Sequence, residues 1–172
     1  MAEAEGIAGT GEQQTGGEEG PQFGLMMQYV KDLSFENPNS PAVYQWQSQP
    51  NIDVQVNLGA QPVSEEVHEV ALKLDITADG TDGVAFKVEL LYAGLFGARN
   101  LPEEQLHPLL MAEAPRLLFP FARRIVSDVV QDGGFPPLML DPIDFGALYM
   151  QRAAQLQAEQ GDSQAPEVTG QA

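Results

Sequence analysis

The sequence predicts an α+β fold in which a four-stranded antiparallel sheet has one face covered by a long, proline-kinked helix and a C-terminal helix. Three observations lead to this prediction. Four segments between residues 28 and 92 alternate apolar and polar side chains, the hydrophobic period becomes helical after Pro102, and a proline-rich segment divides the helical region. Strands that precede helices along the chain are typical of α+β proteins.

The four expected strands read QYVKDLSFE, NIDVQVNL, VHEVALKLDIT and VAFKVELLY, at residues 28–36, 51–58, 67–77 and 84–92. Their alternation is typical of an antiparallel sheet with one buried and one solvated face. In the first strand, Leu33 and Phe35 would face the core, opposite Asp32, Ser34 and Glu36. The segment ADGTDG, between the last two strands, carries the glycines that a tight reversal needs.

The helical period runs from Pro102 to the stop signal Gly133–Gly134. Three prolines within it must each begin, end or kink a helical piece, because proline removes a backbone donor; they are Pro108, Pro115 and Pro120. The following FPPLMLDPI is expected to be extended, since a residue before proline disfavours helix. Asp144 is expected to cap a last helix, FGALYMQRAAQLQAEQ, which carries an apolar stripe.

A single folded domain is expected at residues 22–157, between a disordered acidic tail at 1–21 and a disordered C-terminal tail at 158–172. Both tails have too little apolar surface to offset the entropy of ordering. The N-terminus lacks the basic and apolar regions of a signal peptide. No apolar run approaches the roughly 20 residues of a transmembrane helix. We therefore expect a soluble cytoplasmic protein with no direct membrane insertion.

The composition excludes several classes of function. The 172 residues include 25 acidic and 8 basic side chains, for a formal net charge of −17, which should repel nucleic acid. The chain has no cysteine, so disulfides and thiolate metal sites are excluded. It also lacks phosphate-binding glycine loops, the nucleophile elbow and the HExxH motif. We expect no cofactor.

The titratable side chains do not suggest a catalytic group. His68 is assigned to the polar face of the third strand and His107 to a proline-rich helix start, and neither has a companion at ligand spacing. Asp32 and Glu36 would lie about 13 Å apart along a strand. Paired glycosidase carboxylates lie within about 5 to 9.5 Å of each other. We therefore expect no catalytic residue, no metal site and no enzyme.

Large apolar side chains also occur in segments expected to be loops. They include Tyr44, Trp46, Leu95, Phe96 and the apolar residues of FPPLML. Exposed apolar patches usually indicate association with another molecule. The alternative is that these side chains close the core and an oligomer interface, and composition leaves both possibilities open.

Two long motifs resemble the SecB family of bacterial protein-export chaperones. They are YVKDLSFENPNSP and LFPFARRIVSDVVQDGGFPPLMLDPIDFGALY, and the expected order of strands and helices also matches across residues 23–157. The resemblance implies a cytoplasmic homotetramer, a dimer of dimers, without ATP hydrolysis or a cofactor. Such a chaperone binds unfolded secretory precursor proteins, keeps them competent for translocation and delivers them to the SecA ATPase.

The resemblance also implies two binding surfaces. SecA would dock on an acidic patch of the open sheet face, which corresponds here to Asp32, Glu36 and Glu89, with Lys87 at a position where family members often have an apolar residue. Unfolded clients would bind in apolar grooves. The expected groove residues are Phe23, Met27, Tyr44, Trp46, Leu95, Phe96, Phe135, Leu138 and Leu140.

Two other functions compete with export. An enzyme that uses an apolar cleft would need a buried carboxylate beside a histidine, and no spacing in the sequence supplies one. A SecB-like chaperone dedicated to a specific partner, such as an antitoxin, remains the alternative.

Overall fold

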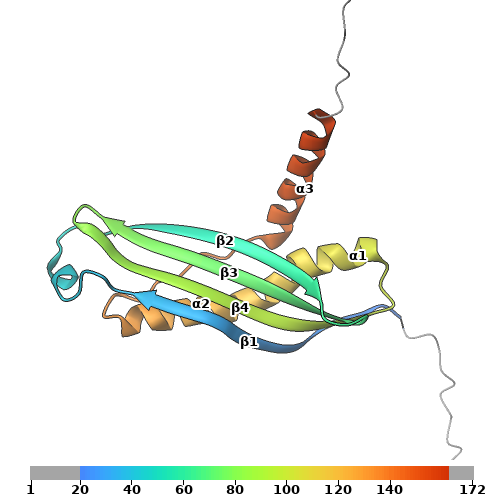
Figure 1. The fold of residues 1–172 in the computed structure, drawn as a ribbon, viewed down its shortest axis with the longest axis horizontal. Coiled ribbons are helices and arrows are strands. Elements are labelled where there is room, and N and C mark those ends of the chain that lie inside the picture. The colour runs from blue at the N-terminus through green and yellow to red at the C-terminus, as the bar shows by residue number, and fades with distance from the viewer. Residues whose placement is uncertain (1–19, 163–172) are drawn as a thin grey trace, which may run out of the picture.

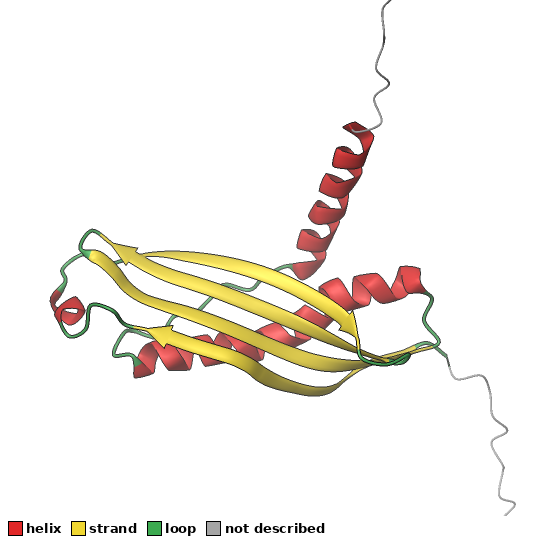
Figure 2. Ribbon diagram, in the orientation of Figure 1, coloured by secondary structure: helices red, strands yellow, loops and turns green. Residues whose placement is uncertain are grey.

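The computed structural model describes residues 20–162, which form one four-stranded antiparallel sheet with helices on one side (Figures 1 and 2). The predicted α+β fold is confirmed. The sheet order is β1-β4-β3-β2, so β1 and β2 are its edges. The strands are β1 Gln22–Glu36, β2 Asn51–Pro62, β3 Val67–Gly80 and β4 Gly83–Arg99.

The alternation along β3 and β4 decides which sheet face is buried. Every second side chain of β3 from Val70 to Ala78 is almost completely buried, as are Val88 and Leu90 of β4. His68 lies two residues before Val70, and its partner on β4 is the buried Phe96. His68 therefore lies on the helix-covered face, and its assignment to the polar face was wrong.

Strand β1 is longer than its alternation predicted, and it contains two register shifts. Residues before position 28 also pair with β4, which itself continues beyond residue 92 to Arg99. The shifts lie between Leu25 and Met27 and between Val30 and Asp32. An extra residue of this kind bends a strand and changes which of its side chains share a face.

The helical region consists of α1 Glu103–Pro108, a π-helical turn at Leu109–Glu113, and α2 Ala114–Asp132. Pro108 ends α1 and Pro115 lies in the first turn of α2, as the missing donors predicted, whereas Pro120 lies inside α2. Helix α2 runs along the sheet and buries one stripe of side chains on it (Figure 2). This stripe includes Leu118, Phe119, Ala122, Val126 and Val130.

Helix α3, Phe145–Asp162, projects away from the sheet (Figure 1). Its start agrees with the predicted cap, because the backbone amide of Ala147 donates to Asp144 Oδ1 at 2.9 Å. His107 of α1 lies against it, with Nδ1 3.0 Å from the Tyr149 hydroxyl. The helix continues past residue 157 because no helix breaker occurs in AQLQAEQ. The remainder of the two expected tails, residues 1–19 and 163–172, lies outside the described residues.

The Gly133–Gly134 pair does more than end α2. Gly134 has φ +85°, which favours glycine, and a Cβ on Gly133 would lie 2.2 Å from Cζ of Phe35. The end of α2 therefore packs directly on the ring of Phe35 in β1, and only a hydrogen fits between them.

We predict that Gly133→Ala will lower the free energy of unfolding by about 1–3 kcal/mol, the usual effect of overpacking. Urea denaturation measures this change. Gly59→Ala in β2 is the matched control, because a Cβ there would meet nothing within 4 Å. Equal stability of the two variants would contradict the close approach.

Candidate functional site: an apolar groove and an open sheet face

An apolar groove of about 480 Å³ lies where the segment after β1, the start of β2 and the linker after α2 meet. The linker residues 134–138 form one wall, and Trp46 to Pro50 form the other. The prolines of the linker prevent helix formation and leave fewer backbone donors to satisfy. The floor comes from the sheet, through Ile52, Ala85 and Phe86.

Aromatic contacts fix the shape of this groove. The Phe135 ring lies 4.9 Å from that of Phe86 and 5.6 Å from that of Tyr44, measured between centroids. The Tyr44 hydroxyl donates to the carbonyl of Gly133 at 2.9 Å and accepts from Asn37 Nδ2 at 2.7 Å. Tyr44 is still half exposed, so one ring face is available to a ligand. The groove is therefore a preformed apolar surface open to solvent.

The motif ENPNSP supports this groove from beneath. Asn39 Nδ2 donates to the carbonyl of Val84 at 2.8 Å and ties the segment after β1 to the start of β4. The 3-10 turn Ala42–Gln45 then buries Val43 and directs Tyr44 towards the linker. The motif thus shapes the groove through its two asparagines.

Four of the expected groove residues line this groove together: Tyr44, Trp46, Phe135 and Leu138. The others lie elsewhere. Phe96 is fully buried and Leu140 is 6% exposed, so both belong to the core. The structure corrects their placement, because β4 continues through Phe96 and the end of the linker turns inward.

The remaining three expected groove residues lie at the opposite end of the sheet. Phe23 stacks on Phe96 with ring centroids 5.4 Å apart. Met27 is exposed, and its register partner on β4 is Leu95, on the face that no helix covers. Sequence reasoning also missed Phe86 and Ile52 as groove residues, although the alternation of their strands assigned both to the apolar face.

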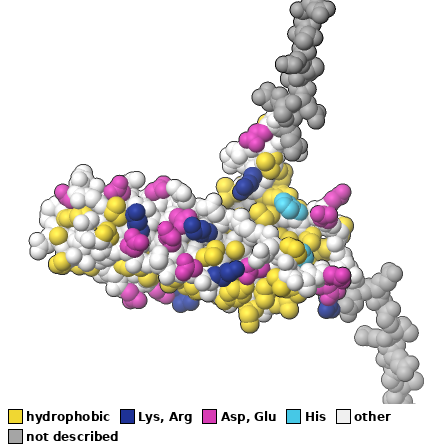
Figure 3. Space-filling model, viewed as in Figure 1, with side chains coloured by type: hydrophobic (Ala, Val, Ile, Leu, Met, Phe, Trp, Pro, Cys, Tyr) yellow, Lys and Arg dark blue, Asp and Glu magenta, His cyan; other side chains and the backbone are white. Residues whose placement is uncertain are grey.

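The helix-free face of the sheet carries the four predicted docking residues. The register places Glu36 opposite Lys87 and Ser34 opposite Glu89. Asp32 lies two residues before Ser34, opposite Leu91. All four charged side chains are exposed, and Figure 3 shows this face with acidic and basic side chains interspersed. Within residues 20–162 none of the four forms an ion pair, so their charges are available to a partner.

Two further charges extend this patch towards β2. Asp75 lies beside Glu89 in the register, and Lys73 lies beside Leu91. These two side chains form an ion pair of 3.1 Å between Lys73 Nζ and Asp75 Oδ1. The patch is therefore mainly acidic, with one paired and one unpaired lysine.

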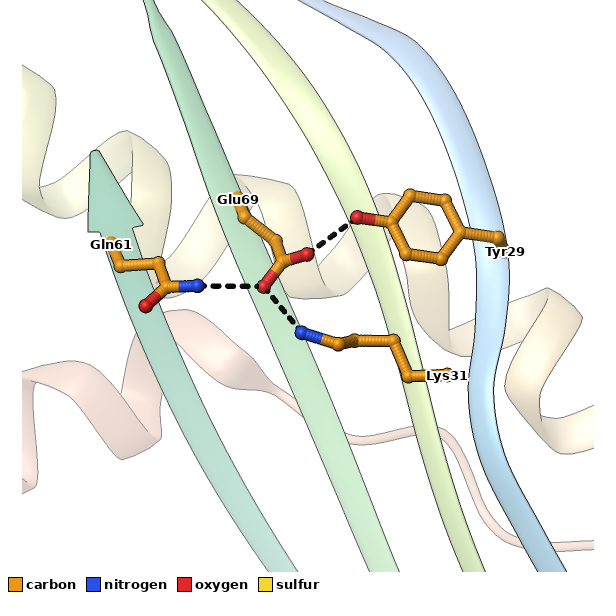
Figure 4. A network of polar contacts seen from close by, with 4 residues as sticks. All are labelled: Tyr29, Lys31, Gln61 and Glu69. Atoms are coloured by element: carbon orange, nitrogen blue, oxygen red, sulfur yellow. Dashed lines mark hydrogen bonds and ion pairs between the residues drawn. The ribbon is translucent and has the colours of Figure 1, made fainter. Parts of the chain in front are cut away.

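A polar cluster on the same face joins β1 to the start of β3 and the end of β2 (Figure 4). The carboxylate of Glu69, which is 9% exposed, accepts from Lys31 Nζ at 2.8 Å, from Gln61 Nε2 at 3.0 Å and from the Tyr29 hydroxyl at 2.5 Å. The Lys31 bond is the main reason that the pKa of Glu69 is lowered. The bond to Glu69 raises the pKa of Tyr29 to about 12. At neutral pH the cluster therefore holds a charged carboxylate and a protonated phenol.

The described residues contain neither a metal-binding group of side chains nor a membrane-spanning helix. Both histidines border one hollow beside α1, but residues 20–162 contain no group of three or more His, Asp or Glu placed to bind a metal ion. In the same range, no helix has the length and apolar character needed to span a bilayer.

Comparison with known proteins identifies what the chain resembles. Residues 16–156 match the family model described as preprotein translocase subunit SecB. The protein-export protein SecB of Zymomonas mobilis is 62% identical over 78% of this chain and 82% of its own length. The corresponding protein of Sphingopyxis alaskensis is 57% identical over 90% of both chains.

A solved structure supports the fold independently. A SecB-like chaperone of Mycobacterium tuberculosis, in complex with a peptide from an antitoxin, aligns with a TM-score of 0.57 over 70% of this chain and 87% of its own. At 16% sequence identity, this likeness concerns the fold alone.

Proposed function

This chain belongs to the SecB family, and from that premise we propose that it is an ATP-independent holdase that keeps unfolded precursor proteins competent for translocation and delivers them to SecA. The observation that carries the proposal is the open apolar groove walled by an extended linker and exposed aromatic side chains. The proposed holdase activity needs neither a cofactor nor a catalytic residue. Its proposed location is the bacterial cytoplasm, where it neither inserts into membranes nor binds nucleic acid.

The groove suits an unfolded client for a physical reason. An unfolded chain offers many weak apolar contacts and no fixed shape, so its holdase needs accessible apolar area more than exact geometry. Tyr44 and Trp46 present broad ring faces, and the linker supplies Leu138. Several copies in one assembly would raise the effective concentration for later client segments once the first is bound.

We predict that the protein suppresses aggregation of a denatured secretory precursor without nucleotide. Trp46→Glu should weaken client binding by about tenfold, or about 1.4 kcal/mol, because it puts a charge into an apolar site. Light scattering of the diluted precursor and fluorescence titration measure the two effects. Val63→Glu is the matched control, since Val63 is an exposed apolar residue outside the groove. Aggregation that proceeds at molar excess of the protein would refute the proposal.

The charged patch of the open sheet face is the proposed SecA dock. Asp32, Glu36 and Glu89 would meet basic groups of the partner, and complementary charge also speeds encounter at low salt. Lys87 would meet an acceptor on the partner, since no carboxylate of residues 20–162 lies within ion-pair distance of it.

We also propose that the protein is a homotetramer, arranged as a dimer of dimers. Edge strand β1 exposes Val30 and Leu33 on its helix side, and α2 exposes Phe121. An open edge of 15 residues with apolar neighbours is suited to pairing with another chain. Multi-angle light scattering should give four times the chain mass, and Phe121→Glu should give a smaller species. A monomer at every concentration would contradict the assembly.

A second candidate function is a chaperone dedicated to one partner. The M. tuberculosis SecB-like chaperone, which shares the fold, was solved in complex with a peptide from an antitoxin, and this complex supports the alternative. A pull-down from cytosol separates the two functions. General export predicts SecA and many unprocessed precursors, whereas a dedicated chaperone would bring down one protein.

A further inference from the structure

We propose that Glu69 is a positioning residue that acts through Lys31. It determines which side chains of β1 point to the helix-free face of the sheet, and so places Asp32 and Glu36 on the face where SecA is proposed to dock. The inference rests on the proposed docking of SecA to that face. Glu69 itself is nearly buried, so it is not a contact residue for a partner.

The phase of β1 depends on one extra residue. Tyr29 pairs with Ala93 and Asp32 pairs with Leu91, so three residues of β1 span two residues of β4. In a regular strand, side chains three residues apart point to opposite faces. Tyr29 and Asp32 share the open face only because Lys31 is inserted between Val30 and Asp32.

Loss of this bulge would invert the rest of the strand. With Tyr29 in place and regular alternation beyond it, Leu33 and Phe35 would turn to the open face and Asp32 and Glu36 would turn towards α2. A one-residue slip has this effect because the side-chain period of a strand is two. Phe35 packs on Phe86 at 6.1 Å and beneath Gly133, which opposes the slip from the core side.

The Glu69 cluster opposes the slip from the open side. Tyr29 and Lys31, on either side of Val30, both bond the same carboxylate, at 2.5 and 2.8 Å. Their side chains reach Glu69 on β3 across β4, where the small Ala93 is fully buried although no helix covers that face. The carboxylate thus holds the side chains of the inserted Lys31 and of Tyr29, two residues before it, in place over β4.

The cluster is strong enough to act as such an anchor. Hydrogen bonds to an ionised carboxylate are roughly twice as strong as neutral ones. Removing one partner leaves a buried charge with fewer bonds, which is strongly unfavourable. The lowered pKa of Glu69 is consistent with this, because the charged form is the one that the three donors stabilise.

Binding of SecA and binding of client, measured separately on the full chain, test the proposal. Glu69→Gln and Lys31→Met should each weaken SecA binding by about tenfold and leave client affinity within about twofold, a difference of about 1.4 kcal/mol in docking alone. Amide exchange of residues 31–36 should accelerate in both variants. The exchanged pair Lys31→Glu with Glu69→Lys should restore docking, because the tyrosine hydroxyl and the glutamine amide can each accept a bond from lysine.

Glu66→Gln is the matched control, since Glu66 also bonds a cation, Arg99, at 2.8 Å, but at an exposed position away from the bulge. Unchanged docking in Glu69→Gln, or an equal loss of SecA and client binding, would overturn the proposal. Absence of SecA binding by the unaltered protein would refute the docking function instead. In that case faster exchange at residues 31–36 in Glu69→Gln would still support the role of Glu69, and unchanged exchange would overturn it.

Discussion

Replacing both Asp32 and Glu36 by lysine will weaken SecA binding by about 100-fold, or about 2.7 kcal/mol, and leave client binding within about twofold. Both carboxylates are exposed, and within the described residues neither forms an ion pair. The exchange therefore removes no ion pair within those residues. It does place like charges opposite the basic groups expected on SecA, and like-charge juxtaposition opposes binding strongly.

Isothermal titration at two salt concentrations measures this effect. Glu103→Lys with Glu104→Lys is the matched control, because it makes the same change in net charge on exposed α1, on the helix side of the sheet. The control should bind SecA within about threefold of the unaltered protein, since long-range attraction is screened over about 8 Å at physiological salt. Equal weakening by the two double variants would mean that net charge, and not the patch, attracts SecA.

The sheet was predictable because its alternation is a local property of the sequence. Val70, Leu72, Leu74 and Ile76 occupy every second position, and all are buried as expected. The β1 bulge was not predictable, because Tyr29 and Lys31 bond a carboxylate about 40 residues away, that of Glu69. The alternation of residues 32–36 placed Asp32 and Glu36 correctly, but it does not reveal that Tyr29 shares their face.

The groove was predictable only in part, and Phe96 shows why. Gly94 and Gly97 flank Leu95 and Phe96, and that pattern suggested a loop. In the structure the same glycines continue β4, and a Cβ on Gly94 would lie 2.8 Å from Cδ2 of Leu118. A glycine that allows close packing and a glycine that forms a turn look alike in sequence. By contrast, four groove residues were correctly expected in connecting segments. Tyr44 and Trp46 lie between two alternating strands, and Phe135 and Leu138 lie in a segment whose prolines disfavour helix.

Because Phe96 lies in the core and Trp46 in the groove, truncating them should lower the stability of the fold by different amounts. Phe96→Ala will lower the free energy of unfolding by about 3–5 kcal/mol, as for other buried phenylalanines. The ring is fully buried and stacks on Phe23 of β1, so its removal leaves a cavity between β4 and the edge strand. Trp46→Ala should lower stability by less than about 1.5 kcal/mol, because Trp46 lies in a partly exposed loop.

Urea denaturation at one fixed protein concentration, with client affinity measured on the folded variants, separates core from groove. Trp46→Ala should weaken client binding by about tenfold, since aromatic side chains dominate apolar recognition. For Phe96, Phe96→Leu keeps most of the apolar volume and should retain the fold with unchanged client affinity. If Phe96→Leu instead weakened client binding while stability stayed high, Phe96 would become accessible during binding. The groove would then extend along β4 to the end of the sheet where Phe23 and Met27 lie.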